Sequence, residues 1–77
     1  MAVEIRVYGG LVRYSPSGKD RFELDIQNPV TIRELLEIVG IPESEVWMVT
    51  VNGVHSRTGQ VVKDNDQIMI FEPVLGG

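Results

Sequence analysis

The chain has 77 residues, an apolar fraction of 43% and a mean hydropathy of +0.03, values typical of one small folded domain and not of a disordered chain. It contains no cysteine, which excludes disulfides, thiolate metal sites and a cysteine nucleophile. The net charge of −4 disfavours nucleic acid as a partner, and it either suits a basic protein surface or serves solubility alone. Without a signal-peptide pattern or an apolar stretch long enough to span a bilayer, we expect a cytoplasmic protein with no membrane partner.

Two strands are expected in the first third of the chain. Residues 3–8 alternate between apolar and polar side chains, which is typical of a half-buried strand, and Gly9 follows as a breaker. Residues 11–21 are rich in serine, proline and glycine, and they are predicted to form a loop. Residues 22–26 alternate again and are the second predicted strand. Its expected inward-facing residues are Phe22, Leu24 and Ile26.

A helix is predicted over residues 32–39. Thr31 is a suitable N-cap, and Glu34 three residues later completes the pattern of a capping box. Apolar residues at i, i+3, i+4 and i+7 form one face of the helix; they are Ile32, Leu35, Leu36 and Val39. Gly40 suits the left-handed position after a helix, and Pro42 prevents its continuation.

The last third of the chain is predicted to form three strands. Residues 47–51 and 67–71 have strand-like composition, and residues 60–62 are expected to be a short edge strand. Pro73 cannot donate to a ladder and ends the last strand. Turns are predicted at Asn52-Gly53 and at Lys63-Asp64-Asn65-Asp66, with Asn65 in a left-handed conformation.

One helix on one sheet gives a two-layer α+β domain in which only one sheet face is covered. The residues expected beneath the helix are Val3, Ile5, Val7, Val49, Val51, Ile68 and Ile70. Trp47 is also expected in the core, with an anchor at the rim of an interface as the alternative. Alternation then sends Tyr8, Met48, Met69 and Phe71 to the open face. Those four residues are either one docking surface for a partner or apolar side chains exposed singly.

After Pro73 the sequence runs Val74-Leu75-Gly76-Gly77, and we expect a domain over residues 1–72 followed by a flexible tail over residues 73–77. Five extended residues reach roughly 16 to 18 Å, and glycines can thread a narrow channel. A terminal carboxylate, whose unperturbed pKa is about 3.3 to 3.7, is ionised and unreactive until it is activated, for example by ATP. The resulting acyl-adenylate accepts sulfur to give a thiocarboxylate, or an amine to give an amide.

Four segments together carry a family resemblance. They are Thr31-Ile32-Arg33-Glu34-Leu35-Leu36, Val49-Thr50-Val51-Asn52-Gly53, Lys63-Asp64-Asn65-Asp66 and Ile70-Phe71-Glu72-Pro73-Val74-Leu75-Gly76-Gly77. Over nearly its whole length the chain resembles the MoaD/ThiS family of ubiquitin-like sulfur carrier proteins, which have the β-grasp fold. The last segment is more similar to MoaD, the small subunit of molybdopterin synthase. The departures are Asn65 where the family has glycine, Glu72 where it has proline, and a loose match over residues 10–14.

The resemblance implies a β-grasp fold with one helix on a mixed sheet of four to five strands. It implies that an ATP-dependent, ubiquitin-activating-type enzyme adenylates Gly77, and that a sulfur donor protein supplies the thiocarboxylate sulfur. An acceptor synthase subunit would then take up Pro73, Val74, Leu75 and Gly76 and receive the sulfur for molybdopterin or a related tungsten or molybdenum cofactor. Phe71 matches the family's aromatic that docks on partners, and alternation places Met69, Met48 and Tyr8 on the same open face. The chain itself would hold no permanent cofactor, since the partner uses the ATP.

Other functions remain open on sequence grounds. The tail also suits a sulfur carrier for thiamine or cysteine synthesis, a ubiquitin-like modifier joined to lysines, or a binding module whose tail has no role. No residue constellation supports a stand-alone enzyme. We expect no metal site, because His55 has no second ligand nearby and Asp64 and Asp66 lack the other ligands of a calcium loop. The side chains of Glu43, Glu45 and Glu72 are expected to be solvated charges.

Overall fold

The structure is a computed structural model and describes residues 1–74. Its strands are β1 (Ala2–Val7), β2 (Arg21–Asp25), β3 (Val30–Thr31), β4 (Met48–Val51), β5 (Val54–Ser56), β6 (Val61–Val62) and β7 (Gln67–Phe71). Its helices are α1 (Ile32–Val39) and the 3-10 helices η1 (Gly9–Tyr14) and η2 (Glu43–Glu45).

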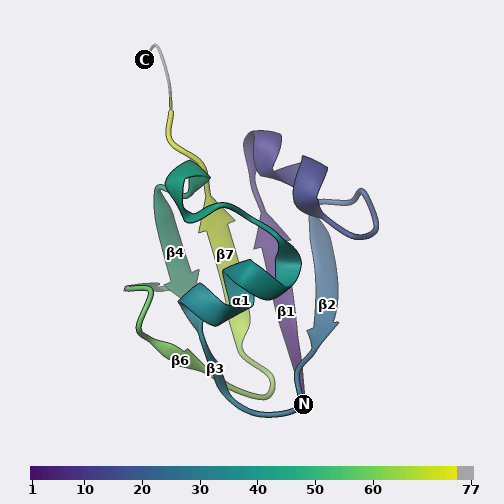
Figure 1. Cartoon of the computed structure of the whole chain (residues 1–77), viewed down its shortest axis with the longest axis vertical. Helices are drawn as coiled ribbons and strands as arrows, with labels where there is room; N and C mark the ends of the chain where they lie inside the picture. The colour runs from purple at the N-terminus through teal and green to yellow at the C-terminus, as the bar shows by residue number, and fades with distance from the viewer. Residues whose placement is uncertain (75–77) are drawn as a thin grey trace.

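The main sheet has five strands in the order β2-β1-β7-β4-β5, and α1 packs across one of its faces (Figure 1). The first and last strands, β1 and β7, are parallel neighbours at its centre, whereas the other pairs are antiparallel. A separate two-stranded sheet joins β3 and β6. The expected two-layer α+β fold with a mixed sheet is therefore confirmed. The N-terminus lies at one end of the sheet, and the chain leaves β7 at the other (Figure 1).

The helix begins and ends where the sequence predicts. Thr31 Oγ1 accepts a hydrogen bond from the Glu34 N–H at 3.1 Å, and Glu34 Oε1 accepts one from the Thr31 N–H at 3.1 Å. The backbone N–H and then the side-chain hydroxyl of Thr31 lower the pKa of the Glu34 carboxyl below its ordinary value. At the other end Gly40 has φ of 90°, a conformation that favours glycine, and its N–H bonds to Leu36 O.

The core lies between α1 and the sheet. The fully buried large side chains are Val3, Ile5, Val7, Leu11, Ile32, Leu35, Leu36, Val62, Ile68 and Ile70. Val51 packs against this cluster but is only half-buried, as are Phe22 and Leu24 of β2. The alternation in β1 and β7 thus predicted the covered face correctly.

Three local predictions need correction. The predicted loop over residues 11–21 begins inside η1, whose Leu11 is only 1% exposed. The six residues of η1 form about two 3-10 turns, which are too few to show a helical period in the sequence. The turn at Asn52-Gly53 is confirmed, with φ of 52° and 82°, but it also leads into the unpredicted strand β5. The predicted short edge strand is β6, and it pairs with β3, a strand that the sequence did not predict, instead of joining the main sheet.

Asn65 has φ of 70°, so the left-handed conformation predicted for that turn is confirmed. Within residues 1–74, every helix is too short or too polar to cross a membrane.

Candidate functional site

The four apolar residues sent to the open face form one contiguous surface, which we call the aromatic–methionine patch (Tyr8, Met48, Met69 and Phe71). Met48 lies directly opposite Phe71 across β4 and β7. The rings of Tyr8 and Phe71 stack with centroids 4.4 Å apart and planes 10° from parallel. The Tyr8 hydroxyl donates to Met69 Sδ at 3.7 Å. Of the two alternatives left open by the sequence, contiguous surface or scatter, the geometry supports the contiguous surface.

Polar groups border the patch toward β2. The Arg6 guanidinium lies 4.9 Å from the centroid of the Tyr8 ring, a cation–π contact, and Arg6 Nε is 3.6 Å from an Asp20 carboxylate oxygen. On the β4 side, Thr50 lies opposite Met69. An apolar centre with a polar rim is the usual composition of a protein–protein interface.

The patch adjoins the point where the chain leaves the sheet. Phe71 is the last residue of β7, and its carbonyl accepts a hydrogen bond from the Trp47 N–H at 2.8 Å. A shallow hollow beyond it is lined by Trp47, Pro73 and Val74. A partner that covers Phe71 would therefore also meet the first residues of the predicted tail.

The placement of Trp47 in the core is wrong, because its side chain is 63% exposed. Strand alternation gives it the same face as Val49, but it precedes β4 at the end of the sheet. Period-two patterns identify the face of a residue without showing how far along the strand that face is covered. Of the two placements that the sequence allows for Trp47, the core or the rim of an interface, the structure thus supports the rim, where Trp47 lines a hollow together with Pro73.

The predicted tail is described only at its start. Pro73 is half-buried and Val74 is 84% exposed, so the chain points out of the domain at this position. Leu75, Gly76 and Gly77, which carry the central functional prediction, lie outside the described residues. Their roles stay predictions.

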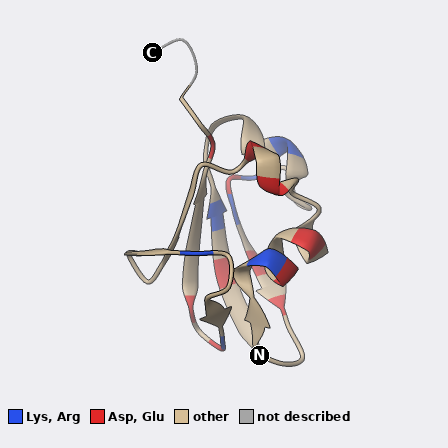
Figure 2. Ribbon diagram, turned by 60° about the vertical axis from the view of Figure 1, so that its left-hand side comes forward, with Lys and Arg blue, Asp and Glu red and all other residues tan. Residues whose placement is uncertain are grey.

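A polar network surrounds the root of the tail, contrary to the expectation that Glu45 and Glu72 are solvated charges. The Glu72 carboxylate accepts a hydrogen bond from the Gly10 N–H. Arg13 Nη1 donates to the Gly10 carbonyl at 2.6 Å, and the same side chain forms an ion pair with Glu45. The Tyr14 hydroxyl also donates to Glu45. Figure 2 shows acidic and basic segments close to the point where the chain leaves the sheet.

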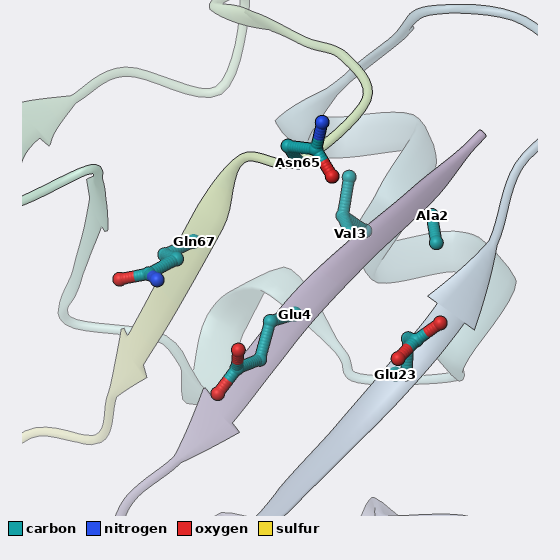
Figure 3. A pocket seen from close by; sticks show the side chains of 6 residues that line it. All are labelled: Ala2, Val3, Glu4, Glu23, Asn65 and Gln67. Carbon is teal, nitrogen blue, oxygen red and sulfur yellow. The ribbon is translucent and has the colours of Figure 1, made fainter.

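A second hollow lies at the opposite end of the sheet, near the N-terminus (Figure 3). Glu4 and Glu23 of neighbouring strands face each other there, and Glu4 also lies 3.7 Å from the Arg21 guanidinium. Among residues 1–74 no three histidine or acidic side chains gather in a way that could hold a metal ion. The nearby Asn52 and Asp66 side chains bond to each other at 2.9 Å and so serve the turns. This hollow therefore shows no arrangement for catalysis.

Comparison with known proteins places this geometry in a family. The family model described as ThiS family matches residues 5–77. No curated protein matches the chain at a significant level.

Solved structures match over the full domain. SAMP1 from Haloferax volcanii, a small archaeal modifier protein, is 20% identical with a TM-score of 0.77, covering 100% of both chains. A putative molybdopterin converting factor subunit 1 from Pyrococcus furiosus is 20% identical with a TM-score of 0.73, covering 96% of this chain and 99% of that one. A third match comes from a complex of subunits 1 and 2 of the molybdopterin-converting factor from Helicobacter pylori. It is 25% identical with a TM-score of 0.61, covering 100% of both chains. The fold is the ubiquitin-like β-grasp.

Proposed function

The chain belongs to the ThiS family, and from this premise we propose that it is a sulfur carrier whose Gly77 carboxylate becomes a thiocarboxylate. The observation that carries the proposal is the arrangement at the end of β7. There the aromatic–methionine patch ends at Phe71, and the predicted tail starts two residues later at Pro73. The domain presents the tail, and the patch provides the surface by which a partner recognises it.

The proposed activation proceeds in two steps. A Gly77 carboxylate oxygen attacks the α-phosphorus of ATP on the activating enzyme, and pyrophosphate leaves. The outer sulfur of a persulfide on the donor protein then attacks the acyl carbon, so that a C–S bond forms and the C–O bond to AMP breaks. A thiol on the donor side then cleaves the S–S bond of the resulting acyl disulfide, which releases the thiocarboxylate, leaves a disulfide on the donor and completes this second step. Activation is needed because an ionised carboxylate is a poor electrophile, and AMP is the leaving group that the free acid lacks.

The chain's own residues contribute position and not chemistry. Phe71 and Met69 make apolar contact with the partner, and Tyr8 and Met48 extend that contact across three strands. Pro73, Val74, Leu75 and Gly76 lie in the partner's channel, where the absence of a side chain at Gly76 allows close approach. In this role the chain is a protein cosubstrate, and ATP is bound by the activating partner.

We propose that the acceptor is the large subunit of a synthase that makes molybdopterin or a related tungsten or molybdenum cofactor. Two matched structures support this choice, since both are molybdopterin converting factor subunits and one of them lies in a complex with subunit 2. A sulfur carrier for thiamine or cysteine synthesis would share the activation steps and differ only in the acceptor.

A ubiquitin-like modifier is the second candidate function, favoured by the match to SAMP1, a modifier protein. In that case a lysine amine of a target protein replaces sulfur as the nucleophile, and an isopeptide bond forms at Gly77. The chemistry up to the adenylate is the same in both candidates.

The test uses chain tagged at its N-terminus, expressed in its own cells, with Gly77 intact, deleted or extended by one residue. A sulfur carrier gives an alkylatable terminus in the intact chain alone and no ladder of covalent conjugates. A modifier gives a ladder that disappears with the deletion. A tail without any role predicts the same growth and the same species for all three forms, which would overturn both candidates.

A further inference from the structure

We propose that Glu72 is a positioning residue: its carboxylate, bound to the Gly9-Gly10 turn, fixes the direction in which the tail leaves the sheet. This inference rests on the proposed function, because it concerns how the tail is delivered to the activating enzyme. It assigns a role to a side chain that sequence analysis treated as a solvated charge.

The parallel pairing of β1 and β7 brings the two groups together. Val7 is the register partner of Ile70, and the Tyr8 N–H donates to the Ile70 carbonyl at 3.1 Å. Gly9 comes two residues after Val7 and Glu72 two residues after Ile70, so both lie just beyond the paired ends of β1 and β7. A glutamate directly after β7 is therefore placed beside the backbone that follows β1, and it reaches the Gly10 N–H.

The two glycines leave room for the carboxylate. A Cβ at Gly9 would collide with the Glu72 carboxylate, and the φ of +61° at Gly9 disfavours any other residue. A Cβ at Gly10 would lie 3.3 Å from Glu72 Oε1 and 2.9 Å from Arg13 Nη1. The turn thus combines a conformation that needs glycine with a space that the glutamate side chain fills.

The turn is itself held from its other side. Leu11, the next residue, is buried in the core, and Arg13 bonds to the Gly10 carbonyl at 2.6 Å. Arg13 and Tyr14 both bind Glu45 of η2. Glu72 is therefore attached to a braced structure that joins η1 and η2, and not to a free loop.

Glu72 is also the last restraint before the tail. On the β4 side, backbone pairing ends where the Trp47 N–H meets the Phe71 carbonyl at 2.8 Å. Among residues 1–74, Glu72 is the last one along the chain with a hydrogen-bond partner. Pro73 has no N–H to donate, and it restricts the backbone of Glu72 to extended conformations. The hydrogen bond of the Glu72 side chain and the proline that follows it together define one direction in which the tail leaves the sheet.

The test compares Glu72→Ala, Glu72→Gln and Glu72→Pro with the matched control Glu37→Ala, which removes an exposed glutamate from α1. For each purified chain, adenylation by the activating enzyme gives kcat and KM, and NMR gives the Gly10 amide shift and the backbone order parameter of Val74. We expect Glu72→Ala to move the Gly10 amide, lower the Val74 order parameter and reduce kcat roughly tenfold, the effect of one charge-assisted hydrogen bond. KM should change little, because the aromatic–methionine patch is intact.

Two rescues separate positioning from a general structural effect. Glu72→Gln retains an oxygen that accepts from Gly10, and Glu72→Pro restricts the backbone directly, so both should recover most of the kcat. The proposal is overturned if Glu72→Ala leaves kcat and the Val74 order parameter at wild-type values. It is also overturned if the two rescue variants lose as much activity as the alanine variant. If no chain, wild type included, is adenylated, the proposed function fails, whereas the Gly10 and Val74 signals still decide whether the tether exists.

Discussion

The two faces of the main sheet are built from the same strands but differ in chemistry. On β7, Ile68 and Ile70 are 1% and 0% exposed beneath α1, while the intervening Met69 and the following Phe71 lie half-buried on the open face. The covered face is almost wholly aliphatic, and the open face gathers methionine and aromatic side chains at one end. Alternate residues of one strand therefore face the core and the open surface in turn, and the proposed function assigns folding to the first set and recognition to the second.

The chemical difference suits those roles. Branched aliphatic side chains have few rotamers and pack closely, which favours one well-ordered core. Methionine is flexible and polarizable, and stacked rings offer a flat apolar surface, which together suit contact with more than one partner. Substitutions on the covered face should thus change stability, whereas those on the open face should change binding.

Replacing Ile70 with alanine should give the largest loss of stability. The side chain is fully buried between α1 and the sheet, and such truncations cost about 2 to 5 kcal/mol of the free energy of unfolding. Urea unfolding followed by circular dichroism measures the change. A loss below about 1 kcal/mol would contradict the division between the faces.

Replacing Phe71 with alanine should weaken binding to the activating enzyme more than it weakens the fold. A central aromatic residue of an interface commonly contributes about 2 kcal/mol, which corresponds to a roughly 30-fold increase in Kd. Calorimetric titration gives the Kd, and urea unfolding of the same protein gives the stability. Glu23→Ala, an exposed change on β2 far from the patch, is the control. Unchanged affinity with a large loss of stability would assign Phe71 to the core.

Replacing Thr31 with alanine should cost about 1 kcal/mol of stability, because the Glu34 N–H loses its side-chain acceptor at the start of α1. Binding through the open face should be unaltered, since α1 lies on the other side of the sheet. Paired measurements of unfolding and of Kd check both parts. A matching loss of affinity would mean that the helix face also contributes to docking.

The smallest predicted effect is a pH dependence of the helix start. Because hydrogen bonds from Thr31 lower the pKa of Glu34 in the folded state, its contribution to stability is complete above the ordinary pKa of 4.5. That contribution is lost as the pH falls through the lowered folded-state pKa. The difference in unfolding free energy between wild type and Glu34→Gln should thus be constant near neutral pH and shrink in acid. A difference that stays the same down to pH about 3 would contradict the capping-box account.

Elements with long or chemically distinct signals were predictable from the sequence. The capping box and Gly40 define α1 by local hydrogen bonding, so its bounds follow from a few residues. The alternation in β7 fixes its covered face, and Asn52-Gly53 fixes a tight turn. In each case the decisive interaction lies within a few residues of its signal.

Features that depend on partners far apart in the sequence were not predictable. The strand β3 exists because β6 pairs with it, and the Glu72 tether exists because β1 and β7 are parallel neighbours. The exposure of Trp47 likewise depends on where the covering layer ends. The aromatic–methionine patch was predictable in part. Alternation predicted which sheet face its residues occupy, whereas their contact with one another depends on the order of the strands in the sheet.

The central claim is that Gly77 carries sulfur. The most direct test is the intact mass of the chain isolated from its own cells, with and without alkylation, followed by localisation of any modification. The account predicts a mass increase equal to replacement of one oxygen by sulfur, located at Gly77, and a terminus that takes up one further alkyl group when the chain is alkylated. An unmodified terminus under sulfur-replete conditions, beside larger species linked through Gly77, would contradict it and identify the chain as a protein modifier.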